Sequence, residues 1–572
     1  MVLSLLMASG HLFAQATDGN LVVRVTDQTD HVIVGTSLEL SNSATGTALR
    51  ATTDDAGQSL FRNVLPGEYE LLVRKDGFSP ATLKRISIEL NSNATASVKL
   101  AIAHAETSID VVDSPVLIDT TSVQIQAVYQ SAQVLDSPAA GLPLAALNLS
   151  LYSAGVASSG ALGVGEGPSV GGQRPRSNSF TIEGVDNNQK DLTLHNLDVP
   201  REAVAEISIL QNQFLAEFGN GSGAQINTVI RGGSNQMHGA LYEYMMNRHL
   251  NAVDQSFARQ GILSNPRFDS NMLGASIGGP LVKDKLFYYS LFQYNPSGQA
   301  GTPSSAVLSP TAEGYGQLSR FTDVSQTNLN VLKTYLPPAP TASATTQVDS
   351  QEIPIGTLPI IQPSYSNLYS SLTSMDYTIS GTDQLRGRYI YANRSGFSTD
   401  TLPMLPAFFQ GENIRQHLIS LGEFHTFSSR VLNEFRAGFS RNDDGIPAGN
   451  AAFPGLDAFP NLVIQNDLNA QIGPFSQAPQ QRVQNGYQLI DNLSWTHGRH
   501  QLKFGGEGRK YISSTSFTSS VRGNYQYSTL DGFLRISALM WWRSVPSALP
   551  LFQGIRSRLR GMPATRSGCA RM

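Results

Sequence analysis

Cysteine is almost missing from this chain of 572 residues, in which Cys569 is the single one. A lone cysteine excludes an intramolecular disulfide framework and any zinc or iron–sulfur site built from several cysteines. Charged side chains are also scarce, at 15% against roughly 25% in ordinary soluble domains. The net charge of −4 provides no strong positive field, so we expect no nucleic-acid partner.

Long apolar runs are lacking as well. No stretch approaches the roughly 18 apolar residues that a transmembrane helix needs. The ten histidines are scattered without a His-Glu-x-x-His pattern, so the sequence predicts no metal site and no cofactor. What remains is a weakly charged chain rich in Gly, Ser and Asn that is either soluble or crosses a membrane as β-strands.

The N-terminus carries an export signal. Residues 1–16 are mostly apolar and end in Ala14-Gln15-Ala16, the pattern of a cleaved secretory signal peptide. The basic start of such signals is missing, because no Lys or Arg precedes Arg24. A start further upstream, or a buried strand, is the alternative interpretation. Export nearly without cysteine favours the periplasm or the outer membrane of a Gram-negative envelope.

Residues 17–103 form the clearest unit. Short β-rich runs alternate with turn signals such as Pro66-Gly67, which predicts a small β-sandwich. The expected strands cover residues 21–25, 31–40, 69–74, 86–90 and 96–102. The stretch 53–78 (TDDAGQSLFRNVLPGEYELLVRKDGF) resembles the carboxypeptidase regulatory-like domain. That resemblance implies a non-catalytic module, and we expect no enzyme.

After residue 236 the sequence alternates between polar and apolar side chains. In residues 385–391, Leu385, Tyr389 and Tyr391 share one face, while Arg386 and Arg388 share the other. The same alternation recurs in residues 431–441 and 501–507. Very short links (380–383, 428–430 and 498–499) alternate with long ones (295–368, 396–413 and 442–486). Such alternation of connections is typical of a transmembrane β-barrel and less so of a soluble sandwich.

Four ordered blocks between residues 172 and 289 carry a specific resemblance. They are GQRPRSNSFTIEGVDNN (172–188), VPREAVAEISILQNQFLAEFG (199–219), GAQINTVIRGGSNQMHG (223–239) and NMLGASIGGPLVKDKLFYY (271–289). Together they resemble the plug domain and first barrel hairpins of TonB-dependent outer-membrane receptors of the Oar-like group. The resemblance implies a plug over residues 115–235, with β-like runs at 205–210 and 224–230. The plug-motif residues are Arg174, Arg176, Glu183, Gly184, Asp186, Glu217 and Gly219.

The resemblance also implies a segment that recruits the energy-coupling protein TonB, placed before the plug. The best candidate lies in the linker 104–114 and reads Glu106-Thr107-Ser108-Ile109-Asp110-Val111. An extended segment of this kind can add as a strand to the sheet edge of a partner. An ordinary interdomain linker is the alternative interpretation.

Receptors of this class close about 22 strands around the plug. Only about ten candidate strands follow residue 236, so residues 236–533 predict an incomplete antiparallel barrel, and we expect the chain to be a fragment. Residues 534–572 hold seven arginines and no carboxylate. We interpret that tail as out-of-frame translation; a genuine basic tail is the alternative.

Two chemical hints are weaker than the plug resemblance. Residues 219–224 (GNGSGA) match a spaced-glycine dinucleotide pattern, but no helical pattern follows them. Glu183 and Asp186 lie three apart, and their place in the plug motif favours a structural role over acid–base chemistry. Arg174 and Arg176 are hypothesised to seat the plug by pairing with carboxylates of the barrel wall.

The sequence therefore predicts a mainly β outer-membrane receptor with a sandwich, an α+β plug and a partial barrel. Its expected partners are a TonB-type protein, outer-membrane lipid and an unknown extracellular solute, for which carbohydrate and peptide are the two classes left open. A secreted or surface β-rich binding protein that uses the N-terminal sandwich is the alternative.

Overall fold

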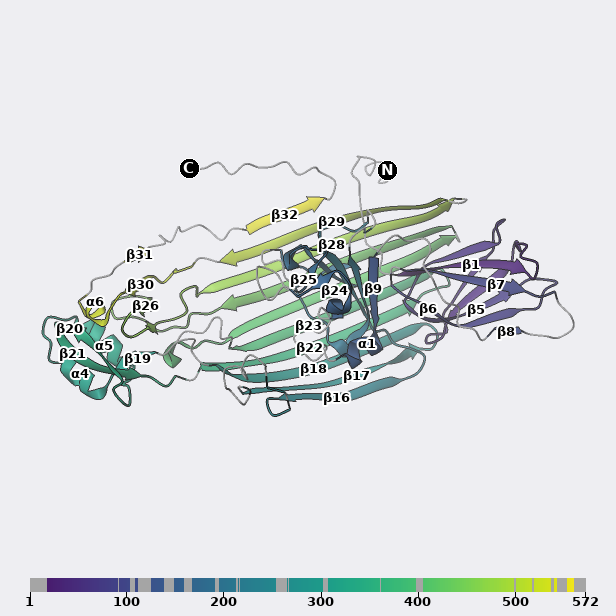
Figure 1. Cartoon of the computed structure of the whole chain (residues 1–572). Helices are drawn as coiled ribbons and strands as arrows, with labels where there is room; N and C mark the ends of the chain where they lie inside the picture. The colour runs from purple at the N-terminus through teal and green to yellow at the C-terminus, as the bar shows by residue number, and fades with distance from the viewer. Residues whose placement is uncertain are drawn as a thin grey trace.

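The structure is a computed structural model in which a sandwich and a lobe lie at opposite ends of a large sheet, with the plug against the middle of that sheet (Figure 1). The structure describes residues 18–90, 92–102, 109–111, 125–137, 149–158, 167–190, 195–211, 214, 217–250, 252–253, 265, 267–301, 307–360, 362–397, 405–428, 430–497, 500–516, 519–535, 540–542 and 553–559. The predicted signal peptide, residues 1–16, lies outside these ranges. No helix in the described ranges has both the length and the apolar character needed to cross a membrane.

The N-terminal part is a sandwich of two sheets. A three-stranded sheet has the order β4-β1-β7, with β1 (Gly19–Asp27), β4 (Gln58–Val64) and β7 (Asn93–Leu100). A five-stranded sheet has the order β3-β2-β5-β6-β8, with β2 (Ser37–Asn42), β3 (Ala48–Thr52), β5 (Gly67–Arg74), β6 (Ala81–Ile88) and β8 (Ile109–Val111). The predicted small β-sandwich is confirmed.

Alternating apolar residues of both sheets fill the space between them. Leu21, Val23 and Val25 of β1 are fully buried, because every second side chain of the strand points inward. The prediction of one strand over residues 31–40 is wrong for the first half of that range. Gly35 adopts a positive φ of 64°, a turn conformation that ends the run, so that β2 begins only at Ser37.

The plug is built on a five-stranded sheet in the order β13-β12-β15-β14-β9. Its strands are β9 (Ile125–Gln130), β12 (Ser179–Ile182), β13 (Val185–Asp186), β14 (Val204–Gln211) and β15 (Ala224–Ile230). Smaller elements cover it: α1 (Ser131–Asp136), η2 (Leu149–Tyr152), the hairpin of β10 (Val156–Ala157) and β11 (Ser169–Val170), η3 (Pro175–Ser177) and η4 (Arg201–Ala203). The runs expected at 205–210 and 224–230 are β14 and β15.

A ten-stranded sheet with antiparallel neighbours forms the barrel wall, and the plug lies against one of its faces (Figure 1). In spatial order its strands are β16 (His238–Asn247), β17 (Phe268–Val282), β18 (Leu286–Gly301), β22 (Gln362–Thr378), β23 (Asp383–Phe397), β24 (Glu412–Ser428), β25 (Val431–Ile446), β28 (Gln480–His497), β29 (His500–Ser516) and β32 (Gln553–Leu559).

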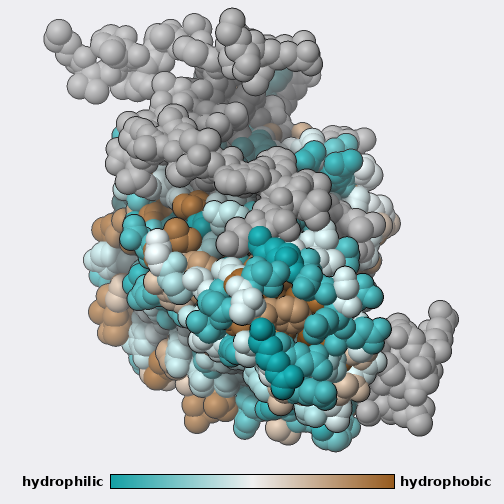
Figure 2. All heavy atoms as spheres, turned by 90° about the vertical axis from the view of Figure 1, so that its left-hand side faces the viewer, coloured by the Kyte–Doolittle hydropathy of each residue, from teal (hydrophilic) through white to brown (hydrophobic). Residues whose placement is uncertain are grey.

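The two faces of this wall have opposite chemistry. Leu385 and Tyr389 of β23 are 40% and 42% exposed, whereas Arg386 and Arg388 between them are each 5% exposed. Apolar side chains therefore cover the outer face, and charged ones point toward the plug. Figure 2 shows hydrophobic side chains gathered along the flank of the molecule, with mainly hydrophilic ones over the end that faces the viewer. This is the arrangement of a sheet that faces lipid outside and polar matter inside.

The wall does not close in the part of the chain that the structure describes. β16 pairs only with β17, and β32 pairs only with β29, so the predicted incomplete barrel is confirmed. Beyond residue 534, β31 (Met540–Trp542) pairs with β30 (Asn524–Tyr527), and β32 pairs with β29. The reading frame of residues 534–572 stays a prediction.

The long connections fold into a separate lobe at one end of the wall, although the sequence predicted no helix or strand within them. The connection between β18 and β22 holds β19 (Leu308–Pro310), α4 (Ala312–Leu318), α5 (Gln326–Tyr335), β20 (Ala344–Val348) and β21 (Gln351–Thr357). Other connections add η5 (Pro406–Phe408), β26 (Asn461–Ile464), β27 (Ala470–Ile472), β30 (Asn524–Tyr527) and α6 (Leu530–Leu534). A common core that includes Leu332, Phe459 and Phe533 joins these segments.

Candidate functional site

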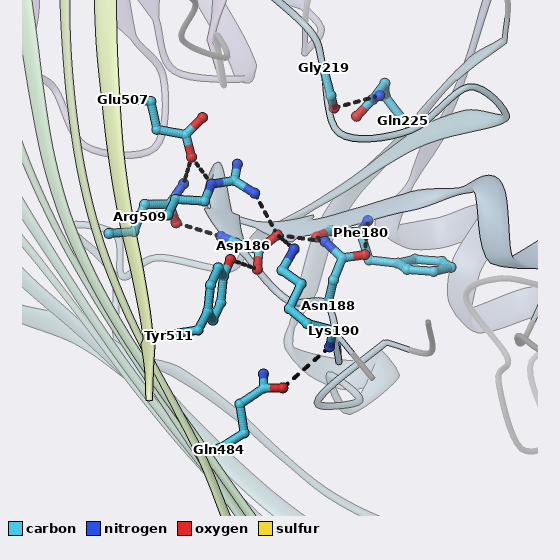
Figure 3. A network of polar contacts seen from close by, with 11 residues as sticks. Phe180, Asp186, Asn188, Lys190, Gly219, Gln225, Gln484, Glu507, Arg509 and Tyr511 are labelled. Carbon is cyan, nitrogen blue, oxygen red and sulfur yellow. Dashed lines mark hydrogen bonds and ion pairs between the residues drawn. The ribbon is translucent and has the colours of Figure 1, made fainter. Parts of the chain in front are cut away.

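A plug carboxylate, Asp186 of β13, lies at the centre of a buried polar network that connects the plug to the barrel wall (Figure 3). Its Oδ1 accepts hydrogen bonds from Nη1 of Arg509 at 2.9 Å and from Nζ of Lys190 at 3.2 Å. Its Oδ2 accepts from the hydroxyl of Tyr511 at 2.6 Å. Its backbone N–H donates to Oε1 of Gln488 at 2.7 Å. Three wall side chains from two strands, β28 and β29, thus hold one plug residue.

The charges of this network keep Asp186 ionised. Burial by itself raises the pKa of Asp186, but Lys190 and Arg509, together with hydrogen bonds from Tyr511 and Asn188, hold that pKa below its usual range. A carboxyl group with a lowered pKa is a poor proton donor at neutral pH. The arrangement supports a structural role, in which Asp186 anchors the plug to the wall.

A second plug carboxylate, Glu183, occupies the tight turn between β12 and β13. Gly184 in the same turn has a φ of +72°, which glycine adopts without strain. Oε1 of Glu183 accepts from the backbone N–H of Ile230 at 2.8 Å and from Nε of Arg388 on β23 at 3.3 Å. Arg388 also donates to Asp376 of β22 at 2.7 Å. A buried guanidinium of this kind depends on its partners, since losing one leaves an uncompensated charge.

Arg174 and Arg176 are not the seating residues that the sequence suggested. Both are exposed around η3, and neither forms an ion pair with a wall carboxylate among the residues that the structure describes. The hypothesis placed the arginines on the plug and the carboxylates on the wall. In the structure the plug provides the carboxylates and the wall provides the guanidinium groups. The sequence placed Arg388 on the charged face of its strand but did not predict its contact with the plug. It did not single out Arg509, whose neighbours Gly508 and Lys510 give no apolar alternation.

Of the other two plug-motif residues, one contacts the wall and the other lies in a loop of the plug. Glu217 forms an ion pair with Lys503 of β29. The backbone oxygen of Gly219 accepts a hydrogen bond from Nε2 of Gln225 at 3.0 Å, which closes the loop before β15 (Figure 3). Glu217 is therefore a third plug carboxylate that meets a wall cation.

The sandwich is fastened to the wall and to the plug by polar contacts. Asp18, at the start of β1, accepts from Nη1 of Arg386 at 2.9 Å, and Arg436 of β25 lies 4.0 Å from its other oxygen. Burial raises the pKa of Asp18, an effect that the two guanidinium groups oppose. On the plug side, the backbone N–H of Leu90 donates to Oε2 of Glu206 on β14 at 3.1 Å.

The predicted docking segment is only partly described. Glu106, Thr107 and Ser108 lie outside the described residues. Ile109, Asp110 and Val111 form β8, which pairs in parallel with β6 at the edge of the sandwich sheet. The described part of the segment is thus extended, as a strand-adding peptide must be.

One group in the described ranges could offer three ligand atoms to a metal ion, namely Asp383, Glu423 and His425 at neighbouring strands β23 and β24. These ligand atoms lie within 4.8 Å of one another. His425 already contacts Asp383 at 2.5 Å, and Asp383 also accepts from Thr382 at 2.6 Å. These contacts explain the cluster as a link between adjacent strands.

Comparison with known families defines the class of this chain. Residues 229–535, more than half of the chain, match the outer membrane beta barrel domain, and residues 20–101 match the carboxypeptidase regulatory-like domain. The chain belongs to the outer membrane beta-barrel domain family. It is an outer-membrane protein with an N-terminal regulatory-like domain, and it is similar to a TonB-dependent transporter.

Among individual proteins, the TonB-dependent transporter Oar of Myxococcus xanthus is 25% identical over 268 residues, which are 46% of this chain and 25% of that protein. The outer membrane transporter YddB of Escherichia coli has a TM-score of 0.49 at 12% identity, covering 68% of this chain and 49% of that one. The siderophore receptor PirA of Pseudomonas aeruginosa has a TM-score of 0.41 at 11% identity, covering 69% and 50%. The chain spans a quarter of Oar and about half of the two solved receptors.

Proposed function

We propose that this chain provides the plug and part of the channel wall of a TonB-coupled transporter for a large hydrated solute. The observation that supports this proposal most directly is the chemistry of the inner wall. Buried polar side chains recur on successive wall strands; they include Gln293, Ser370, Ser374, Arg386, Arg388, Ser420, Glu434, Arg436, Asn442, Arg482, Gln484, Gln488, Asn492 and Arg509. Such a surface would line a hydrophilic passage once the plug moves.

The plug is suited to a removable closure because much of its contact with the wall is ionic. Water can solvate Asp186, Glu183 and the wall guanidinium groups after separation, whereas an apolar interface costs roughly 25 cal/mol for each Å² exposed. One apolar patch also joins the two parts, where Ile182 and Ile230 of the plug meet Leu291 and Leu372 of the wall. In this proposal the charges set the position of the plug, and an applied force displaces it.

The two ends of the wall take different partners in the proposed function. The lobe, built from long connections, would contact the extracellular solute, whose class (carbohydrate or peptide) stays a prediction. The opposite end carries the short turns, the sandwich and β8, where a TonB-type protein would bind in the periplasm. The alternative, a secreted or surface β-rich binding protein that uses the N-terminal sandwich, leaves the barrel-domain match over residues 229–535 without a role.

The proposal is tested with the full chain in the outer membrane of a Gram-negative host. The double variant Asp186→Asn/Arg388→Gln removes one partner from each seating pair, and breaking a buried pair typically costs about 3–5 kcal/mol. We expect the plug to be held less firmly, so that cells admit more of a large antibiotic such as vancomycin. The measurement is vancomycin susceptibility, together with heat-modifiable mobility of the protein in the outer-membrane fraction.

The matched control is Arg50→Gln, because Arg50 pairs with Glu39 on the surface of the sandwich and its side chain is 77% exposed. This variant changes charge by the same kind of substitution away from the plug. Equal vancomycin susceptibility of the double variant and the control, at equal amounts in the membrane, would contradict the proposal. Absence of the unaltered chain from the outer-membrane fraction would contradict it as well.

A further inference from the structure

A partly open cavity of about 590 Å³ lies where sandwich, plug and wall meet. The sandwich contributes residues of β4, β5 and the turn after β2, the plug contributes the end of β15, and the wall contributes strand ends of β22–β25. Three guanidinium side chains, Arg62, Arg386 and Arg388, are among the lining residues. The cavity therefore brings cations from two domains together at the periplasmic end of the wall.

The donors of Arg62 are not satisfied by the described residues. Its Nε and Nη2 are buried, and neither has a hydrogen-bond partner in the described part of the chain. Arg386 is only 5% exposed, and its Nε is also buried without a hydrogen-bond partner in the described part of the chain. Buried polar groups normally have partners, and a guanidinium cannot shed its proton to avoid the cost of burial. Both side chains therefore have free N–H donors, for which the described residues provide no hydrogen-bond acceptor.

Two of the three lining arginines already contact carboxylates. Arg388 donates to Glu183 and Asp376, and Nη1 of Arg386 donates to Asp18. Apart from Asp376, the lining carboxylate is Glu68. Lining hydroxyl and amide groups, such as Thr45, Thr47 and Asn42, could add hydrogen bonds. An excess of unpaired donors beside a cation selects an anion over a neutral or cationic ligand.

We propose that this cavity is a binding site for a small anion that carries a phosphate or carboxylate group, with Arg62 as its main donor. One water occupies about 30 Å³ in the liquid, so the cavity has the volume of many waters. It therefore has room for a phosphate ion, or for a small organic phosphate or dicarboxylate together with ordered water. A ligand held by Arg62 of the sandwich and Arg386 of the wall would fasten the two parts together. By mass action it stabilises the docked sandwich in proportion to its concentration.

The experiment uses the purified full chain in detergent, with inorganic phosphate and succinate as separate probes at constant ionic strength. Calorimetry measures binding, and the thermal unfolding midpoint measures stabilisation. We expect saturable binding of at least one probe, and we expect Arg62→Gln to weaken it by about tenfold or more, as for the loss of a charge-assisted hydrogen bond. Preference for phosphate or for succinate identifies the chemical source of the natural ligand.

Arg50→Gln is the control, because it removes an exposed arginine of the same sandwich and should leave binding unchanged. Arg62→Lys, which keeps the charge but not the planar fork, covers the case in which Arg62→Gln fails to fold, and it should bind with intermediate affinity. No saturable binding to the unaltered chain, or equal binding by the Arg62 variants, would overturn the proposal. Neither result depends on transport, so the site and the proposed function can fail separately.

Discussion

At the scale of single residues, carboxylates of the plug contact arginines of the wall, and these contacts position the plug. Asp186 and Glu183 each meet a wall guanidinium, and Glu217 meets Lys503. A buried plug carboxylate is fixed in position, because it must keep several hydrogen bonds at the same time. The same physical rule applies to Glu206, which binds the backbone of Leu90 across the junction between sandwich and plug.

Glu206 makes this junction sensitive to pH. Burial raises the pKa of Glu206 to about 8, with a further contribution from the negative charge of Glu89, while the Leu90 N–H opposes the shift. A carboxyl whose pKa is raised on folding stabilises the folded form at low pH, and that stabilisation is lost as the pH rises from the unfolded value through about 8. We expect the unfolding midpoint of the sandwich to fall over this interval, and Glu206→Gln to abolish that fall.

The measurement is thermal unfolding followed from pH about 5 to about 9, on the full chain and on the Glu206→Gln variant. Glutamine keeps an acceptor oxygen for the Leu90 N–H but cannot ionise. A midpoint that falls equally in both proteins would show that another group controls the junction.

At the scale of elements, the sandwich sheet gains its last strand from the linker. β8 extends the sheet beyond β6, with Thr82 opposite Asp110 in the register. An edge strand presents unpaired backbone groups that another chain can use. If residues 109–111 dock to a TonB-type protein, their pairing with β6 competes with that encounter.

A disulfide between β6 and β8 tests this competition. In a Cys569→Ser background, the pair Thr82→Cys/Asp110→Cys replaces register partners on adjacent strands, which lie within disulfide reach. We expect the oxidised protein to capture less of the periplasmic domain of the host TonB-type protein, and reductant to restore capture. Pull-down of the full chain by that purified domain is the measurement.

The control is Ser37→Cys/Thr52→Cys, which links register partners of β2 and β3 at the other edge of the same sheet. Equal capture by the oxidised and reduced docking-strand pair would mean that the partner adds to the free side of β8 or binds elsewhere. Failure of capture by the unaltered chain would instead count against the docking segment itself.

At the scale of the whole molecule, two folded bodies sit at opposite ends of the wall (Figure 1). The sandwich and the lobe each have their own hydrophobic core, and the plug has a third. Separate cores allow one part to loosen without unfolding the others. The lobe should therefore tolerate damage to its core without any loss of plug seating.

Leu332→Ala tests this independence. Leu332 of α5 is fully buried in the lobe core, and removing a buried leucine side chain typically costs about 2–5 kcal/mol. We expect proteolysis within residues 307–360 to increase, while recovery in the outer membrane and vancomycin exclusion stay unchanged. Leu456→Ala, at a 50% exposed leucine, should change neither. A loss of vancomycin exclusion in the Leu332 variant would show that lobe and plug are coupled.

The strands were largely readable because alternation is a local property. Leu385, Arg386 and Arg388 revealed the two faces of β23, and the short link at residues 380–383 revealed the turn before it. The lobe was not readable, since its core joins segments from connections that are far apart in the sequence. Phe459 and Phe533 pack in that same core, but the sequence around each of them does not indicate that the two side chains are close in space.

The order of amino acids alone specified the mainly β class, the three-part plan and the opposite faces of the wall, because strand periodicity and turn chemistry act over a few residues. Only the tertiary structure decided which charges meet. Asp186 and Arg509 are more than 300 positions apart, and Asp18 and Arg386 are more than 360 apart. Their pairing follows from how the plug and the sandwich pack against the sheet, since electrostatic partners are chosen by distance in space.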